Sequence, residues 1–123
     1  MVQWAVADEA KRVPPVFFRI EGGAEPVRDW LRELPREDRK IIGEGLEQLE
    51  YAWPAAMPLC RALGKGLFEL RVSLPSRRIA RVMVCVHDDE LVALHAFIKK
   101  TRATPEADLK LAHKRKQDYE RTT

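Results

Sequence analysis

Apolar residues recur along the chain with two different periods, and the change predicts a helical first half and a strand-rich second half. In 26–34 and again in 36–53, apolar residues return at steps of three and four, which is typical of amphipathic helices. Pro35 leaves only a very short link between the two, so we expect an antiparallel helical hairpin. The aromatic and β-branched segment 16–20 lies between a Pro-Pro and a Gly-Gly pair and predicts a strand before the helices.

Three further strands are predicted in the second half. Residues 66–74 alternate apolar and polar side chains, which is typical of a strand with one buried face. Residues 79–86 are almost wholly apolar and indicate a central strand buried on both faces, with Arg81 as their one charge. Residues 91–98 form the third of these strands, and the short links between them predict an antiparallel meander.

A last helix is predicted over 106–120, after Pro105 and with Thr104 as its N-cap. The resulting order, β-α-α-β-β-β-α, indicates an α+β fold. We expect a twisted antiparallel sheet of about four strands, with an N-terminal helical hairpin, a C-terminal helix, and the helices packed on one face of the sheet. A chain of 123 residues has room for one domain. We therefore treat 1–123 as a single domain and 1–15 as an N-terminal extension of unassigned role.

The composition is that of an ordinary globular protein, with 46% hydrophobic residues, 33% charged residues and a mean hydropathy of −0.36. No apolar run approaches the roughly 18 residues of a membrane span, and the N-terminus lacks the apolar block of a signal peptide. Cys60 and Cys85 form no metal-binding or redox motif and suit a reducing compartment. We expect a cytoplasmic protein without a membrane partner.

Positive charge is concentrated in one region. The net charge of the chain is only +3, but residues 61–102 hold nine basic residues against four acidic ones, which gives this segment +5 and leaves −2 for the remainder. An excess of positive charge confined to one region is expected for a partner that is a polyanion. A solvated basic face without any partner is the alternative.

Pleat geometry brings several of these charges together. Side chains two residues apart on a strand share a face, so Glu69 and Arg71 point away from the apolar face of their strand. Arg81 lies in an apolar run, where a lone arginine costs stability unless it is exposed, paired or functional. If the strands are neighbours, Arg71, Arg81 and either Lys99 or Lys100 converge on one positively charged surface.

Such a surface suits cleavage of a phosphodiester by the adjacent ribose 2′-hydroxyl. The negative charge that develops on the phosphate needs fixed cations, and arginine offers a planar fork of N–H donors. A general base and a general acid are also needed, and Glu69 and His95 are of suitable type. The sequence has no glycine-rich phosphate loop, no nucleophile elbow and no metal-ligand spacing. We therefore expect a metal-independent reaction without a cofactor.

Each of these candidates also has a structural explanation. Glu69 is equally suited to a cross-strand ion pair with Arg71 or Arg81. His95 is of a type that often packs within a strand, and two lysines at a strand end are often plain solvated charge. The remaining candidates for substrate binding are Lys65, Lys99, Arg78 and Phe97.

Four short motifs in order carry a resemblance. They are GLFELR at 66–71, RVMV at 81–84, LHAFIKKT at 94–101, and Thr104-Pro105 before a charged helix. They resemble the phage-derived Gp49/HigB branch of the RelE/ParE toxin superfamily, where the motifs run Leu-Trp-Glu-Leu-Arg, Tyr-Arg-Ile-Leu-Tyr, Leu-Leu-His-Gly-Phe-x-Lys-Lys-Thr and Thr-Pro. The similarity covers about the last half of the chain, and the first half agrees in architecture only.

This resemblance implies a RelE-like fold and the toxin of a type II toxin–antitoxin pair. It also implies an endoribonuclease that acts on mRNA, usually on the ribosome, without a cofactor. The partners would be mRNA, the ribosome and a cognate antitoxin, often a helix-turn-helix protein. By position, Arg71, Arg81 and Lys100 would stabilise the phosphate with Lys99 and Lys65 in support, while Glu69 would act as a base or orient Arg71.

Two other functions fit the same sequence. Some members of the superfamily inhibit DNA gyrase without catalysis, and such a toxin would not need Glu69 or His95. A non-toxic, phage-derived module that binds nucleic acid is the third possibility.

Overall fold

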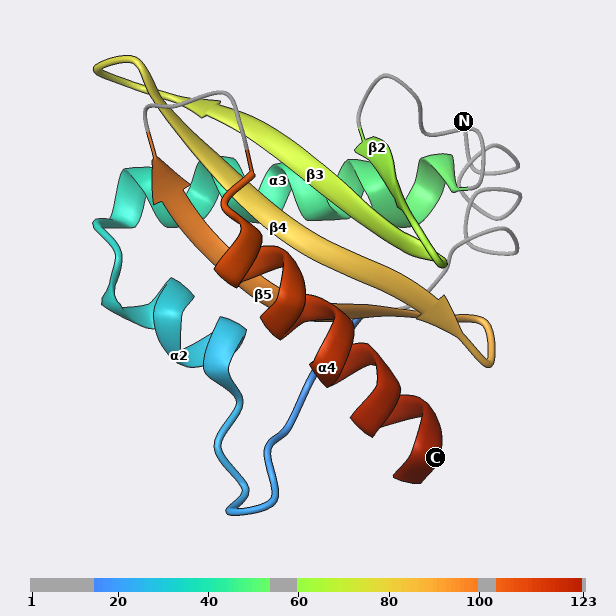
Figure 1. Ribbon diagram of the computed structural model, residues 1–123. Helices are drawn as coiled ribbons and strands as arrows, with labels where there is room; N and C mark the ends of the chain where they lie inside the picture. The colour runs from blue at the N-terminus through green and yellow to red at the C-terminus, as the bar shows by residue number, and fades with distance from the viewer. Residues whose placement is uncertain (1–14, 54–59, 100–103, 123) are drawn as a thin grey trace, which may run out of the picture.

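A five-stranded sheet forms the middle layer of the protein, with helices on both of its faces (Figure 1). The structure is a computed structural model, and it describes residues 15–53, 60–99 and 104–122, except for the side chain of Lys99. The described elements, in chain order, are β1 (Pro15–Phe17), α2 (Pro26–Glu33), α3 (Arg36–Ala52), β2 (Cys60–Gly64), β3 (Leu67–Leu74), β4 (Arg78–His87), β5 (Glu90–Lys99) and α4 (Glu106–Thr122). The elements predicted from sequence periodicity are confirmed, with bounds that differ by a few residues.

The strand order in the sheet is β1-β5-β4-β3-β2. Strands β3, β4 and β5 form the predicted antiparallel meander. Strand β1 pairs with β5 in parallel, so the sheet is mixed, whereas the sequence predicted an antiparallel one. Strand β2 pairs with β3 and was not predicted, because its sequence, CRALG, has no β-branched residue and is very short. Its backbone hydrogen bonds to the edge of β3 are what make it a strand.

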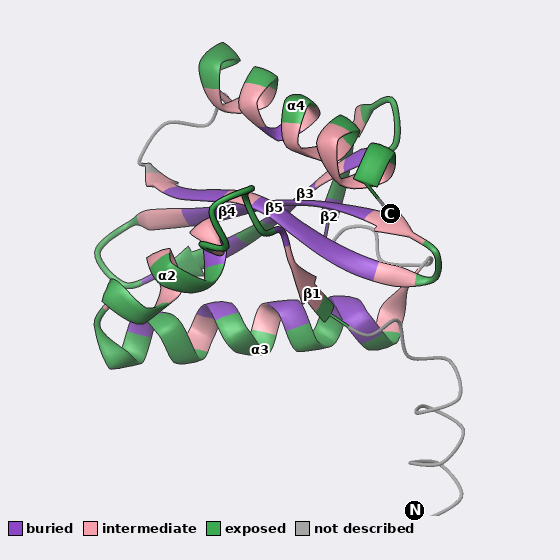
Figure 2. Ribbon diagram, turned by 90° about the horizontal axis from the view of Figure 1, so that it is seen from below, coloured by how far each residue is buried: buried purple, intermediate pink, exposed green. Residues whose placement is uncertain are grey.

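Helices cover both faces of the sheet, which corrects the expectation that they would all pack on one face. Figure 2 shows α3 and α2 on one side and α4 on the other. We call these the α3 face and the α4 face. Residues 80–85 of β4 are all buried, and a strand that is apolar on both sides requires a covering layer on each. The two consecutive N-terminal helices contact different parts of the sheet, α2 mainly β1 and β5, and α3 mainly β3.

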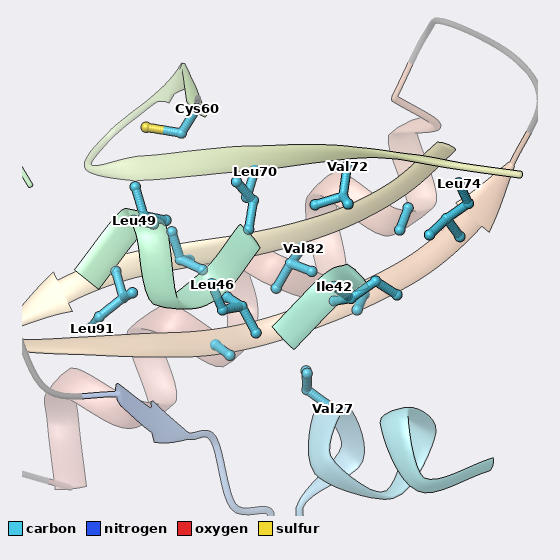
Figure 3. Close-up of a cluster of buried hydrophobic side chains, with 14 residues drawn as sticks. Val27, Ile42, Leu46, Leu49, Cys60, Leu70, Val72, Leu74, Val82 and Leu91 are labelled. Atoms are coloured by element: carbon cyan, nitrogen blue, oxygen red, sulfur yellow. The ribbon is translucent and has the colours of Figure 1, made fainter. Parts of the chain in front are cut away.

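The core is correspondingly split into two clusters. On the α3 face, the helical residues Ile42, Leu46 and Leu49 pack against buried residues that include Leu70 and Val82 (Figure 3). On the α4 face, a second cluster joins the last helix to the strands: Phe18, Leu67, Met83, Cys85, Val92, Leu94, Phe97 and Ala112. Each strand of the meander therefore contributes residues to both cores.

An irregularity in β5 changes which of its residues share a face. Met83 pairs with His95, but the next residue of β4, Val84, pairs with Ala93, so Leu94 is an extra residue in the ladder. As a result Leu94 lies in the same buried cluster as Phe97, on the α4 face. Simple alternation had placed these two on opposite faces. None of the helices in the described ranges is long and apolar enough to cross a membrane.

Candidate functional site

Four charged side chains gather on the α4 face where β2, β3 and β4 lie side by side. Arg61 of β2 pairs in register with Glu69 of β3, and Arg71 of β3 pairs with Arg81 of β4. Directly opposite residues of an antiparallel pair project to the same side of the sheet. Three arginines therefore share this part of the α4 face with one carboxylate, and the group carries a net positive charge.

Glu69 is the centre of a buried polar network. Its Oε1 accepts hydrogen bonds from Arg81 Nη1 at 3.2 Å and from Arg61 Nη2 at 3.3 Å, and its Oε2 accepts one from the Thr104 hydroxyl at 2.5 Å. The side chains of Glu69 and Arg81 have 0% exposed area. The cross-strand ion pair that the sequence left open for Glu69 is thus formed, and its partner is Arg81.

Within this network Arg81 supports its neighbours and is not placed to contact substrate. A guanidinium with no exposed surface does not reach a ligand in this conformation, and burying it is costly without a paired carboxylate. Thr104 was predicted as an N-cap, and its hydroxyl donates to Glu69 instead. Because Thr104 lies two residues before Glu106, the first residue of α4, the network ties the start of that helix to β2, β3 and β4.

Arg71 and Arg61 are the cations of this group that solvent reaches. Arg71 is exposed, and the Arg61 side chain is 48% exposed although it contacts Glu69. Arg71 was predicted as a site residue, whereas Arg61 was not, because the strand that carries it was missed. Its place opposite Glu69 follows directly once β2 is recognised. The face therefore offers two accessible guanidinium groups beside a fixed ion pair.

His95 lies on the same face, separated from Glu69 by the strand between them. Glu69 and His95 both pair in register with Met83, from its two sides. His95 Nε2 lies 2.6 Å from Asp108 Oδ1 on α4, and the two side chains are 15% and 20% exposed. The His95 ring also lies 5.6 Å from the ring of Phe97, centre to centre. His95 is therefore packed between β5 and α4, and Asp108 is its polar partner, which the sequence did not indicate.

Arg78 is not brought together with the other candidates. It pairs with Leu74, whose side chain belongs to the core on the α3 face. Its Nη1 and Nη2 donate to the two carboxylate oxygens of Asp38 at 2.7 and 3.0 Å, and its Nε donates to the Pro75 carbonyl at 3.0 Å. The hydrogen bonds from Arg78 hold the pKa of Asp38 below its usual value. These contacts join α3 to the β3–β4 turn and indicate a structural role for Arg78.

The predicted lysines lie at two separate places. Lys65 stands in the β2–β3 turn with a φ of 56°, next to Gly66, whose backbone lies against the Lys116 side chain of α4. Burial and the charges of Lys65 and Lys116 lower the pKa of His113. Lys99 ends β5 opposite Ile79. Lys100 falls outside the described residues.

The remaining candidate, Phe97, is 9% exposed and pairs with Arg81 across β4 and β5. It belongs to the apolar cluster under α4. The structure therefore brings together Glu69, Arg71 and Arg81 with Phe97 beside Arg81. It places His95 in the register row of Glu69, on the other side of β4, and keeps Arg78 on the opposite face of the sheet.

A comparison with known protein families finds a match for most of the chain. A model of the family described as phage-derived protein Gp49-like matches residues 29–117, which is well over half of the chain. The matched region contains α3, the whole meander and most of α4. No curated protein matches the chain.

Proposed function

Because the chain belongs to the phage-derived Gp49-like family, a family of RelE/HigB-like toxins, we propose that it is an endoribonuclease that inhibits translation by cutting mRNA on the ribosome. Family membership makes the protein a toxin–antitoxin type of module. The ribonuclease activity is our inference from the residues of the α4 face.

The observation that carries the proposal is the exposed Arg71 beside the buried Glu69–Arg81 pair. In the proposed reaction the ribose 2′-oxygen bonds to the adjacent phosphorus and the bond from phosphorus to the 5′-oxygen breaks. The products are a 2′,3′-cyclic phosphate and a 5′-hydroxyl end. Negative charge builds up on the phosphate oxygens in the transition state, and Arg71 and Arg61 are placed to stabilise it through their N–H donors.

In this mechanism Glu69 and Arg81 are positioning residues. Each is fully buried and fixed by the other, so together they hold the adjacent part of β3, from which Arg71 projects. A rigid base for a charged side chain limits the reorganisation needed when substrate charge develops. Because Glu69 is held in this positioning role, proton transfer falls to His95, which must leave Asp108 to reach substrate.

The other cations are proposed to bind the RNA strand on either side of the cleaved phosphate. Lys99 lies at the end of β5 in the register row of Ile79 and Ser73, and Lys100 follows it in the sequence. Lys65 extends the positive charge toward the β2–β3 turn. Phe97 packs beneath this surface, in the apolar cluster under α4. We propose a cognate antitoxin, of the helix-turn-helix class, as the protein partner, and the cytoplasm as the place of action.

The proposal is tested by controlled expression in bacterial cells. We expect arrested translation and transcripts cut at defined positions, whereas Arg71→Ala should remove both effects. Arg32→Ala is the matched control, since it removes an exposed arginine from α2 instead of the sheet. Intact transcripts together with DNA damage would indicate a gyrase inhibitor, and normal growth would indicate a non-toxic binding module; either result contradicts the proposal.

A further inference from the structure

A groove of about 930 Å³ lies between the C-terminal half of α4 and the segment that follows β1. Its apolar lining comes from Phe18, Ile20 and Leu111. Phe18 is buried, but Ile20 is 41% exposed, which makes it one of two exposed large apolar side chains in the described part of the chain. An apolar side chain left in solvent beside a groove is typical of a binding surface.

The charges around the groove are predominantly positive. Four basic residues line it, Arg19, Lys114, Arg115 and Arg121, against Glu21 and Asp118. Asp118 is shared by two cations, Arg121 at 2.6 Å and Lys114 at 3.0 Å. Both cations are far out in solvent, with side chains 76% and 71% exposed. One carboxylate does not neutralise both, so this edge of the groove keeps a net positive charge.

Arg115 is held in place within the same groove. Its Nη1 donates to the Leu94 carbonyl at 2.9 Å, and its guanidinium carbon lies 5.7 Å from the centre of the Phe18 ring. A cation fixed by a backbone carbonyl and an aromatic ring loses little further conformational freedom on binding. The groove therefore combines an exposed apolar side chain with a pre-ordered positive charge.

The shape of the groove indicates what fits it. On α4 the lining residues Leu111, Lys114, Arg115, Asp118, Arg121 and Thr122 return at steps of three and four, so they form one continuous face of the helix. At 1.5 Å per residue this face is about 16 Å long, the length of about three helical turns. The segment 18–21 lines the groove as well. A second helix lying along α4 would contact both.

We propose that this groove binds an acidic amphipathic helix, about three turns long, from a partner protein. The identification of that partner as the antitoxin rests on the proposed function, whereas the binding of such a helix does not. Acidic side chains would pair with Lys114 and Arg121, and the apolar side of the helix would cover Ile20. An RNA strand fits less well, because it would leave Ile20 exposed and bring phosphates toward Glu21 and Asp118.

The groove is distinct from the proposed catalytic surface. Thr104, before the start of α4, contacts Glu69, and the groove begins at Leu111, about 10 Å further along the chain at the helical rise. A partner helix in the groove therefore leaves Arg71 accessible.

A synthetic peptide tests the binding directly. The probe is a 12-residue helical peptide with Glu on one side and Leu on the other, added to the ¹⁵N-labelled full chain at low salt. We expect amide shifts confined to 18–21 and 111–122, and no such shifts with a peptide carrying Lys in place of Glu. The double variant Ile20→Asp/Arg121→Glu should weaken binding at least 100-fold, whereas Lys40→Glu, on the exposed side of α3, should leave it unchanged. Absent shifts, shifts spread over the sheet, or groove shifts caused by a short single-stranded RNA would overturn the proposal.

A second experiment addresses the identity of the partner. If the chain arrests growth, the protein whose co-expression restores growth is the antitoxin, and its affinity is measured by calorimetry. The Ile20→Asp/Arg121→Glu variant should remain toxic. It should bind this antitoxin at least 100-fold more weakly than the Lys40→Glu variant does. Unchanged affinity would contradict the antitoxin as occupant. A chain without toxicity would contradict the proposed function and leave the peptide result to decide on the groove.

Discussion

The two faces of the sheet each hold an arginine paired with a carboxylate, and the two pairs differ in where they lie. On the α3 face, Arg78 binds Asp38 at the margin of the core, with the arginine side chain 31% exposed. On the α4 face, Arg81 binds Glu69 in the interior, and both side chains are fully buried. The first pair joins a helix to a turn. The second lies beneath the exposed Arg71, and its carboxylate accepts a hydrogen bond from Thr104, which precedes α4.

The difference in location indicates a different role for each pair. In the Arg78–Asp38 pair the carboxylate is buried, but the guanidinium keeps contact with solvent, so the pair is less desolvated than Glu69–Arg81 while it fastens neighbouring elements. A fully buried pair costs several kcal/mol of desolvation per ion, and an apolar pair of similar volume often stabilises a core as well. Stability alone therefore does not explain Glu69 and Arg81, whereas the positioning of Arg71 and α4 does.

Removing one partner of the buried pair should have the largest effect on stability. Glu69→Ala leaves the Arg81 charge buried without its carboxylate, and we expect a loss of about 3–5 kcal/mol in the free energy of unfolding, measured by urea denaturation. The double variant Glu69→Leu/Arg81→Met should regain most of that stability but should not regain toxicity. A double variant that is both stable and fully toxic would contradict the positioning role.

A substitution that leaves a cavity in the core on the α3 face should lower stability without changing RNA cleavage. Leu49 is fully buried in the α3-face cluster, and Leu49→Ala should cost about 2–5 kcal/mol of unfolding free energy. RNA cleavage per folded molecule should stay at the wild-type value, because Leu49 lies on the face of the sheet opposite the proposed site. A cleavage rate that falls in the folded protein would show that the two faces are not functionally separate.

A smaller effect is expected from the hydroxyl that joins the network to α4. Thr104→Val removes the hydrogen bond to buried Glu69 with little change in shape, and it should cost about 1–3 kcal/mol. Amide hydrogen exchange should increase first at the start of α4, since the network fastens that end. Uniform exchange along the helix would contradict this anchoring. Thr122→Val, near the other end of α4 and bonded only to backbone, is the control.

The Arg78–Asp38 pair should make the free energy of unfolding depend on pH. Arg78 lowers the pKa of Asp38 in the folded protein, so the stabilisation is fully present above the ordinary aspartate value of about 3.9 and is lost as the pH falls below it. Asp38→Asn should be less stable than wild type at pH 7, and the difference should shrink below about pH 4. A difference that is constant from pH 7 to pH 3 would contradict this ion pair.

The order of elements was predictable because periodicity reports burial. Alternation in β3 and the apolar run 79–86 predicted the meander, and that run, apolar except for Arg81, already implied a covering layer on each face of the sheet. Two features were not predictable. Strand β2 has no apolar alternation of its own, and it is a strand because it pairs with the edge of β3. The extra residue at Leu94 changes which residues of β5 face α4, and no glycine marks it in the sequence.

The candidate site was predictable in part for the same reason. Residue type and spacing placed Glu69, Arg71 and Arg81 on one face. They did not tell which arginine would be buried, because that depends on where α4 crosses the sheet and on the carboxylate between them. The helix also supplied Asp108 to His95, a contact between segments far apart in the sequence.

In the proposed reaction Arg71 stabilises the charge of the cleaved phosphate, whereas Arg78, on the other face of the sheet, does not. The most direct measurement is the single-turnover rate of mRNA cleavage on purified ribosomes, with all proteins folded to the same extent. We predict a rate about 10²–10³-fold lower for Arg71→Ala and a wild-type rate for Arg78→Ala once its stability is matched. Cleavage by Arg71→Ala at the wild-type rate would contradict the account.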